Sequence, residues 1–489
     1  MTNNLFKLFH KAFIMSSNKL YYFIVLIIFF GSCKKFVDVS APTTTISAAN
    51  VYSNDATAAA VLTGIYTKLS QSSNIASSGM STISFYAGLS ADEFNLYTGV
   101  VNQAYIKYYT NSLTQTQTGI EWWNIYQHIF TCNSAIEGLS TTTTLTPQIK
   151  QQLLGEAKFM RAFFYFYLVN LYGDVPLILS TDYKNNSLLP RSPKSDVLKQ
   201  IIDDLKEAKN LLNGNYVSAD AHTITSERVR PTKWAAQALL ARTYLYNSEW
   251  ANAETETTAL ISNSSIFSLS SLDGCFLRNS TEAIWQLQPV NLGANTEEAR
   301  FLIIPATGFS GDNYPVYIST RLLNAFESND QRKLKWLNKY TDATVTPQVD
   351  YYYPFKYKVN TYNAPVTEYL MVLRLGEQYL IRAEARAQLN NISGAQSDLN
   401  AVRARAGLGA TSANDMTSLL TTILHERQVE LFSEWGNRWF DLKRTGNINS
   451  VMNIVTPQKG GTWNPNWQLY PIPLSELKTN PHLTQNTGY

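Results

Sequence analysis

The densest group of ionisable residues lies in the stretch HERQVELFSEWGNRWFDLKRTG, which begins at His425. Glu426, Glu430 and Glu434 recur every four residues, so a helix would place their carboxylates on one stripe. Two kinds of chemistry use such groups. Carboxylates beside a histidine can bind a metal ion, and a pair of carboxylic acids can hydrolyse a glycosidic bond.

Neither kind of chemistry fits the rest of this stretch. The metal-binding pattern HExxH is absent. Basic residues share the segment with the carboxylates, and aromatic residues flank them: Arg427, Arg438, Lys443, Arg444, Trp435, Trp439 and Phe440. Carboxylates and guanidinium groups mixed in this way are typical of a partly buried ion-pair network. We therefore interpret the stretch as one that fixes helix packing.

Other catalytic signatures are missing from the sequence. It contains no GxSxG elbow, no Walker loop and no CxxC pair, and its five histidines do not have metal-ligand spacing. The sequence therefore indicates no catalytic residue, no metal ligand and no cofactor. A glycosidase remains an alternative, because its two acids can lie far apart in sequence.

A cysteine near the start of the chain has a different setting, in the stretch IIFFGSCKK. It follows eleven uncharged residues, Leu20 to Phe30, and a basic head with Lys7, Lys11 and Lys19. This layout is typical of a secretory signal peptide. A membrane-spanning helix needs about 20 apolar residues, so a permanent anchor is disfavoured.

Cleavage before Cys33 would leave this cysteine at the new N-terminus, where lipoprotein processing attaches acyl chains. The stretch resembles a bacterial lipobox, although Phe30 stands where leucine is usual. The alternative is an ordinary signal peptide with an incidental cysteine. We expect a signal peptide at 1–32, a lipidated tether at 33–50 and a single large binding domain at 51–489.

The charge balance argues against a nucleic-acid ligand. The chain has 40 basic and 37 acidic side chains, and removal of the expected signal peptide takes away three lysines and no acid. The mature chain is then neutral, whereas nucleic-acid binders carry a basic excess.

Aromatic residues make up 12% of the chain, which suits a neutral polar ligand. Cys132 and Cys275 can either pair or remain as buried thiols.

Apolar periodicity predicts a mainly α-helical fold. We expect a helix from Asp55 onward and others at 120–139, 146–171 and 193–212. The second half of the 146–171 helix lies in the stretch RAFFYFYLVNLYGDVPL. This half is apolar on almost every side and must be covered all round. Two regions, 71–118 and 262–366, look poor in helix, and AIWQLQPV and YYYPFKYKV within the second read as short strands.

Two later segments look like each other. Each places alanine at one point, Ala241 or Ala383, and again twelve residues later, at Ala253 or Ala395, across a short polar turn. Small residues there let two antiparallel helices approach closely. The pattern resembles the tetratricopeptide repeat, whose helix pairs stack into a solenoid.

Several longer motifs together resemble the SusD/RagB family of outer-membrane nutrient-uptake lipoproteins. They run in the family's order: the lipobox with KKFVDVSAPTTTIS, then EAKFMRAFFYFYLVNLYGDVPLI, VLRLGEQYLIRAEARAQLN, LNAVRARAGL, ILHERQVELFSEWGNRWFDLKR and the closing LYPIPLSELKTNPHLTQNTGY. Departures are small, such as Thr487 in place of proline. The resemblance implies tetratricopeptide-like helix pairs packed against a loop-rich region with a few short strands.

The resemblance also implies a function. It predicts a lipid-anchored protein of the outer membrane, facing the exterior, that binds an oligosaccharide and delivers it to a SusC-like TonB-dependent transporter. No binding residue transfers from the family by motif. The sugar identity, a calcium requirement and the transporter-contact residues are not readable from the sequence.

The two helix-poor regions are where we expect the ligand, because sugar C–H faces stack on aromatic rings while amide and carboxylate groups bind hydroxyls. The candidates are Asn95, Tyr97, Tyr105, Tyr108, Asp312, Tyr314, Tyr317 and Trp336. Two other functions stay open: a surface lipoprotein that hydrolyses glycans, and a helical-repeat scaffold that binds peptides.

Overall fold

The computed structural model describes residues 51–71, 81–116, 120 and 122–489. Tyr52–Tyr489 forms one compact unit. The expected signal peptide, the lipidation site Cys33 and the tether at 33–50 lie outside the described residues. Within the described part of the chain, no helix combines the length and apolar composition needed to cross a bilayer.

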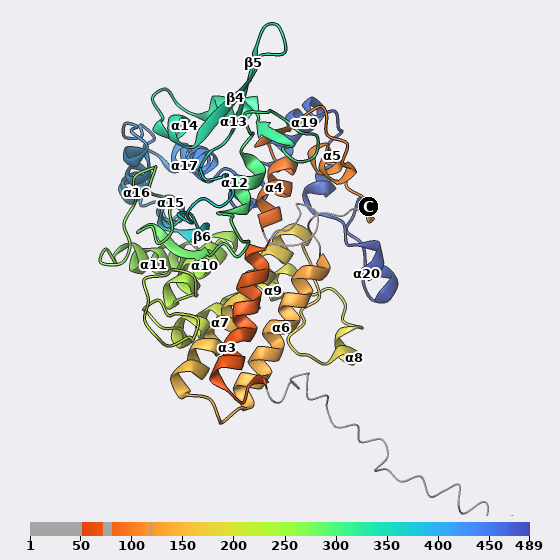
Figure 1. Cartoon of the computed structure of the whole chain (residues 1–489), viewed down its shortest axis with the longest axis vertical. Coiled ribbons are helices and arrows are strands. Elements are labelled where there is room, and N and C mark those ends of the chain that lie inside the picture. The colour runs from red at the N-terminus through yellow and green to blue at the C-terminus, as the bar shows by residue number, and fades with distance from the viewer. Residues whose placement is uncertain (1–50, 72–80, 117–119, 121) are drawn as a thin grey trace, which may run out of the picture. The chain divides into compact units, whose positions relative to one another are not determined.

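The unit is mainly helical, as the sequence predicts. Its longer helices are α3 (Asp55–Ser70), α6 (Trp122–Thr141), α7 (Pro147–Tyr172), α9 (Lys194–Leu211), α10 (Lys233–Tyr246), α11 (Trp250–Ile261), α15 (Leu375–Gln388), α16 (Ile392–Arg405) and α17 (Met416–Glu430) (Figure 1). The shorter ones are α4 (Ser81–Ser90), α5 (Gln103–Tyr109), α8 (Tyr183–Asn186), α12 (Glu297–Leu302), α13 (Thr320–Ala325), α14 (Gln331–Lys335), α18 (Asn437–Arg444), α19 (Ile448–Gln458) and α20 (Leu474–Thr479).

The helix boundaries follow from local chemistry. Asn54 caps α3, because its side-chain oxygen accepts a hydrogen bond from the Ala56 N–H at 2.9 Å. Proline at position 147 opens α7, and Gly173 follows its end with a φ of +77°, a conformation that favours glycine. Every residue from Phe159 to Tyr172 is buried, so the prediction that this helix is covered all round is confirmed.

Consecutive helices pack against one another in chain order. α6 contacts α7, α7 contacts α9, α9 contacts α10, α10 contacts α11, α11 contacts α15, and α15 contacts both α16 and α17. The α10–α11 and α15–α16 pairs are the two predicted helix pairs. Their alanines, Ala241, Ala253, Ala383 and Ala395, are fully buried. The predicted tetratricopeptide-like pairs are therefore confirmed, with a methyl group at each point of close approach.

The described residues form three small antiparallel sheets of two strands each. They pair β1 (Phe94–Leu96) with β3 (Val316–Ile318), β2 (Ala283–Leu287) with β6 (Leu370–Arg374), and β4 (Leu337–Asp342) with β5 (Val349–Pro354). The strand predicted at AIWQLQPV is β2, and the strand predicted at YYYPFKYKV overlaps the end of β5. The β4–β5 hairpin lies at the opposite end of the unit from the lower ends of α3 and α6 (Figure 1).

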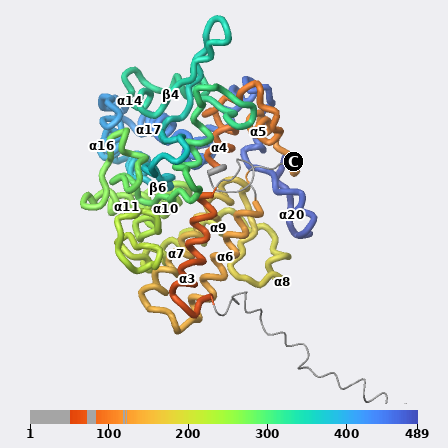
Figure 2. The backbone as a smooth tube through the Cα atoms, in the orientation of Figure 1, coloured from red at the N-terminus to blue at the C-terminus, as the bar shows by residue number. Residues whose placement is uncertain are grey.

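The first helix-poor region was predicted incorrectly, because 71–118 contains α4 and α5. Residues 83–90 of α4 are all buried, so the helix lacks the polar stripe by which amphipathic helices are recognised. α4 contacts α18, and Figure 2 shows it among the C-terminal segments.

The sequence did not decide whether Cys132 and Cys275 form a disulfide. In the structure both are free and buried.

Candidate functional site: an aromatic cluster on two small sheets

Five aromatic side chains from four separate segments gather beside the β1–β3 and β4–β5 sheets. We call them the aromatic cluster: Tyr97, Phe309, Tyr317, Tyr340 and Tyr351. Each ring is half-buried, so each keeps part of its surface toward solvent. Large aromatic side chains are normally buried in a core, and partly exposed ones gathered together mark a surface built for contact.

The rings are held by one another. Tyr97 and Phe309 stack face to face with centroids 4.2 Å apart and planes 4° from parallel. Tyr351 meets Phe309 edge-on at 4.9 Å and Tyr317 edge-on at 5.0 Å. Phe309 also contacts Tyr317 and Tyr340 edge-on, each at 6.0 Å. These separations are those of favourable aromatic pairs, so the rings form a stable surface without a ligand.

Strand register explains how distant residues meet. In the β4–β5 hairpin Tyr340 lies directly opposite Tyr351, and in the β1–β3 sheet Tyr317 lies opposite Asn95. Because side chains alternate along a strand, the tyrosine pair occupies one face of the hairpin. Gly308, with a φ of +82°, precedes Phe309, and a Cβ there would lie 2.6 Å from the Tyr340 hydroxyl. Glycine is thus required for the loop to approach the hairpin.

Polar groups border the cluster without carrying charge. The side-chain oxygen of Asn95 accepts a hydrogen bond from the Tyr109 hydroxyl at 3.4 Å. Burial raises the pKa of Tyr109 and of Tyr317, and the neighbouring tyrosine of each adds to the effect. Both hydroxyls therefore remain protonated at neutral pH, when they can donate and accept hydrogen bonds.

The sequence-based candidates divide into three groups: those at the cluster, those in the neighbouring loop, and those that are buried. In the first group, Tyr97 and Tyr317 belong to the cluster and Asn95 borders it. The second group is Asp312 and Tyr314. Asp312 joins two loops, because its Oδ1 accepts from the N–H of Val101 at 3.0 Å and from that of Asn102 at 3.1 Å. Tyr314 lies in the same loop as Asp312 and is half-buried.

The third group corrects the sequence-based expectation. Tyr105 and Tyr108 are each 3% exposed and Trp336 is not exposed at all. Tyr105 packs on Phe85 with centroids 5.0 Å apart, and the Tyr108 hydroxyl accepts from the Ile120 N–H at 3.1 Å. A ring without an exposed face has no surface on which a sugar can stack, so these three are left out of the candidate site.

Phe309, Tyr340 and Tyr351 were not predicted from the sequence. Phe309 belongs to the same loop as two chosen candidates, and Tyr351 begins a run predicted to be a strand. The available signal was the alternation along that strand, which places Tyr351 on the face opposite to Tyr352. The partner strand β4 and its register were not identified from the sequence, so the pairing with Tyr340 could not be predicted.

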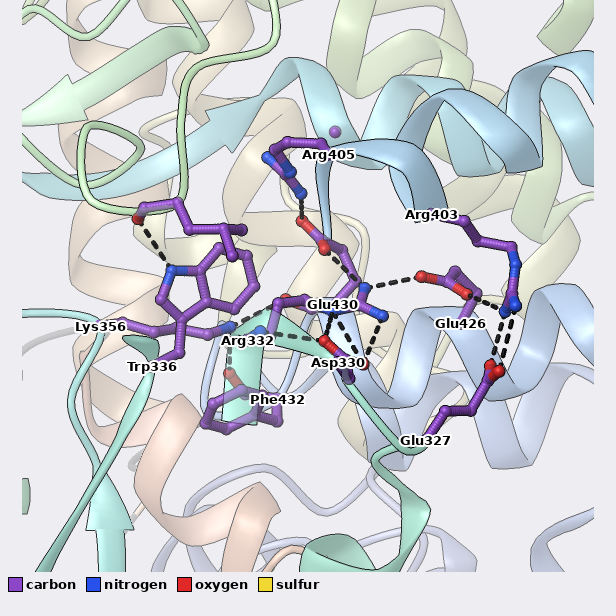
Figure 3. A network of polar contacts seen from close by, with 12 residues as sticks. Glu327, Asp330, Arg332, Trp336, Lys356, Arg403, Arg405, Glu426, Glu430 and Phe432 are labelled. Carbon is purple, nitrogen blue, oxygen red and sulfur yellow. Dashed lines mark hydrogen bonds and ion pairs between the residues drawn. The ribbon is translucent and has the colours of Figure 1, made fainter. Parts of the chain in front are cut away.

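Glu426, Glu430 and Glu434 are buried, and Figure 3 shows Glu426 and Glu430 among the basic side chains that they contact. Glu430 is fully buried and contacts three arginines: Arg374 at 2.6 Å, Arg332 at 2.9 Å, and Arg405. Burial opposes ionisation of Glu430, but Arg405, Arg374 and Arg332 outweigh it and hold its pKa well below the ordinary value. Glu430 is therefore a charged member of a buried network.

The two flanking carboxylates are bonded in the same way. Glu426 contacts Arg332 at 2.6 Å and Arg403 at 3.3 Å, and Glu434 contacts Lys356 at 2.5 Å and Arg374 at 2.8 Å. The network joins α17 to β6, α14 and the end of α16, which are far apart in sequence. The prediction of a packing network is confirmed. It also explains the burial of Trp336, whose ring lies beneath Lys356 and Arg405.

Across the residues that the structure describes, no group of three His, Cys, Asp or Glu side chains is placed to hold a metal ion. The aromatic cluster offers apolar ring faces bordered by neutral hydrogen-bonding groups.

Comparison with known proteins gives a consistent family match. The model described as "SusD family" matches residues 280–489, and the model described as "Starch-binding associating with outer membrane" matches residues 35–245. SusD-like protein P25 of Formosa agariphila is 24% identical over 542 aligned residues, which cover 96% of this chain and 98% of that relative.

Solved structures share the fold. A SusD superfamily protein from Bacteroides vulgatus superposes with a TM-score of 0.75 at 21% identity, covering 89% of this chain and 99% of the other. A laminarin-binding SusD-like protein superposes with a TM-score of 0.72 at 22% identity, covering 90% of this chain and all of the other (100%). At these sequence identities the superposition shows a shared fold and nothing about the ligand.

Proposed function

This chain belongs to the SusD/RagB family, and on that premise we propose that it is a surface lipoprotein that binds a neutral oligosaccharide on its aromatic cluster. The bound glycan is then passed to a SusC-like TonB-dependent transporter in the outer membrane. The role is capture and delivery, without cleavage of the glycan.

The observation that carries this proposal is the aromatic cluster itself. Its five rings come from four segments and are fixed against each other by stacking and edge contacts. Pyranose rings present flat C–H faces that bind to aromatic rings of this kind, and such a contact costs little entropy when the rings are already positioned.

The charge around the cluster favours a neutral glycan. The tyrosine hydroxyls whose pKa is raised stay uncharged, and Asn95 has an amide that can bind sugar hydroxyls. On the hairpin, Lys339 and Asp350 pair at 2.6 Å, and both lie on the face opposite Tyr340 and Tyr351. Neither charge is directed at the ligand surface that we propose.

The membrane attachment in this proposal rests on the sequence and on the family description. The description "associating with outer membrane" belongs to the model that matches residues 35–245. Acylation of Cys33 would supply the anchor, and residues 33–50 the tether. One acyl chain binds a membrane only marginally, so we propose that Cys33 carries more than one.

The proposal is tested by binding and product analysis on a panel of polysaccharides. We expect wild-type protein to retain a neutral glycan without releasing new reducing ends. In calorimetry, Tyr351→Ala should weaken binding by roughly three- to tenfold, because it removes one stacking ring from the cluster. The matched control is Trp123→Ala on α6, which removes an aromatic ring that is 57% exposed and outside the cluster.

The outcomes distinguish the alternatives. New reducing ends would favour a glycan hydrolase. Capture of a transporter or of peptides with no affinity for any glycan would favour a helical-repeat scaffold. Equal loss of affinity in Tyr351→Ala and Trp123→Ala would remove the aromatic cluster from the proposal.

A further inference from the structure

A second concave surface, made from residues outside the aromatic cluster, lies where the end of α7 meets α18 and the C-terminal segment. It is a pocket of about 540 Å³. Its charged lining consists of four basic side chains, Arg191, Lys194, Lys443 and Arg444, and one acidic side chain, Asp174. We call it the basic pocket. Most of the remaining lining is polar and neutral, including five amides: Asn170, Asn466, Gln468, Gln485 and Asn486.

One of the four cations is neutralised by the protein. The Arg444 guanidinium donates to Asp441 at 2.8 Å and to both oxygens of Glu384, at 2.5 and 2.8 Å. Arg191 is held differently, because it donates to the neutral acceptors Asp174 O, Tyr172 O, Thr484 O and Asn486 Oδ1. Burial lowers the pKa of Arg191, and the nearby Asp174 carboxylate partly offsets this effect.

The two lysines have no carboxylate within ion-pair distance among the described residues. The Lys443 ammonium donates to Asn170 O, the carbonyl of a residue in the last turn of α7. An ammonium has three N–H donors, so it can bind further acceptors in the pocket. Lys194 is exposed, and Asp174 accepts from its backbone N–H at 2.8 Å.

The neutral wall of the pocket is fixed in position. Asn486 donates through its amide to Tyr172 O at 2.9 Å and Tyr470 O at 2.7 Å, and Gln485 exchanges hydrogen bonds with the backbone of Ile472. A surface held by this many bonds is already formed before a ligand arrives, which reduces the entropy lost on binding.

From this arrangement we propose that the basic pocket is a second ligand site, which binds the oxyanion group of a small acidic molecule. The carboxylate, sulfate or phosphate would lie between Lys443, Lys194 and Arg191, where charge-assisted hydrogen bonds are strongest. Two sources share this chemistry: an acidic sugar, whose hydroxyls would contact the neutral amides, and a free inorganic oxyanion.

Proton uptake at Lys443 should accompany anion binding. Burial lowers the pKa of Lys443 well below its ordinary value, and repulsion from Lys194 lowers it further. The other charges lining the pocket are Asp174, Arg191 and Arg444. An anion placed beside Lys443 favours the charged ammonium, so binding should take up protons and should weaken as pH rises.

Calorimetry on the full chain in detergent tests the proposal with four probes: glucuronate, glucose 6-sulfate, inorganic phosphate, and uncharged glucose. We expect at least one of the three anions to bind and glucose not to. Binding of the sugar acids alone identifies an acidic saccharide as the ligand, and binding that includes phosphate identifies a general oxyanion site.

Two variants test the residues. Lys443→Met keeps the aliphatic stem and should reduce anion affinity more than tenfold, because it removes a charge-assisted donor. Lys194→Gln changes an exposed side chain and leaves the contact of Lys443 with Asn170 O intact. It should reduce anion affinity about threefold. Lys206→Gln, also exposed on α9 but outside the pocket, is the control and should have no effect.

Absence of binding by all three anions would overturn the proposal. So would affinities in Lys194→Gln that equal those of Lys206→Gln. These results are independent of the aromatic cluster, because none of its residues lines the basic pocket.

Discussion

The buried ion-pair network around Glu430 and the aromatic cluster around Phe309 use opposite chemistry in opposite places. The network has charged groups without exposure to solvent, each bonded to several partners. The cluster has uncharged rings that remain half-exposed and contact mainly each other. The charged groups of the network are therefore committed to packing, whereas the half-buried rings of the cluster keep surface that a ligand can contact.

The difference has an energetic basis. A buried charge is tolerated only when partners replace the water that it has lost, so the network fixes the relative positions of α17, β6 and α14. A half-buried ring is tolerated by itself and keeps an apolar face available to a ligand.

The largest effect is expected from breaking the network. Glu430→Gln removes the charge that compensates Arg332, Arg374 and Arg405 and should lower the free energy of unfolding by about 3–5 kcal/mol. The control is Glu207→Gln, which breaks the surface pair with Lys158 (2.9 Å) and should cost less than about 1 kcal/mol. Urea denaturation measures both. An equal loss in the free energy of unfolding for the two variants would contradict the view that the buried network stabilises the fold more than a surface pair does.

A smaller, pH-dependent effect is expected at Glu298 on α12, a buried carboxyl outside the network. Burial raises its pKa to about 8, and Glu297 adds to the effect. The folded state therefore holds a proton that the unfolded chain releases near the ordinary value of 4.5. The contribution of Glu298 to stability is fully present below that value and is lost as pH rises to about 8.

Glu298→Gln cannot ionise, so the variant should gain stability relative to wild type between pH 5 and pH 8. Denaturation at both pH values measures the gain. Asp203→Asn on the exposed face of α9 is the control and should follow the wild-type pH dependence. If the stability of Glu298→Gln changed with pH in parallel with that of the wild type, the carboxyl would ionise at its ordinary pKa.

The smallest effect is expected on the hairpin face turned away from the cluster. Asp350→Asn breaks the exposed pair with Lys339 and should change neither the melting temperature nor glycan affinity measurably. Tyr351→Ala, one residue along and on the other face, should reduce glycan affinity. A loss of binding in Asp350→Asn would place the ligand on the wrong face of the hairpin for our proposal.

Local sequence patterns predicted the scaffold well. The alanine spacing identified the α10–α11 and α15–α16 pairs, and the four-residue repeat of Glu426, Glu430 and Glu434 identified a charged stripe that proved to be buried. Both signals lie within one or two helices. The network's partners come from β6, α14 and α16, so their identity required the fold.

The candidate site was predicted only in part, for a physical reason. Its rings come from residues 97, 309, 317, 340 and 351. They are brought together by the pairing of β1 with β3 and of β4 with β5, by the contact of β3 with β5, and by the close approach of the Gly308 loop to Tyr340. Trp336 was misplaced because its burial depends on the cations above its ring, which come from distant segments. Local pattern cannot distinguish a tryptophan under such a network from one on a surface.

The most direct test of the central claim is a crystal structure of the protein with a bound neutral oligosaccharide, taken from the strongest binder in the polysaccharide panel. We predict that a sugar ring lies with its C–H face against the aromatic cluster, and that its hydroxyls bond to Asn95 or the neighbouring tyrosine hydroxyls. A glycan bound elsewhere, with the cluster unoccupied, would contradict the account.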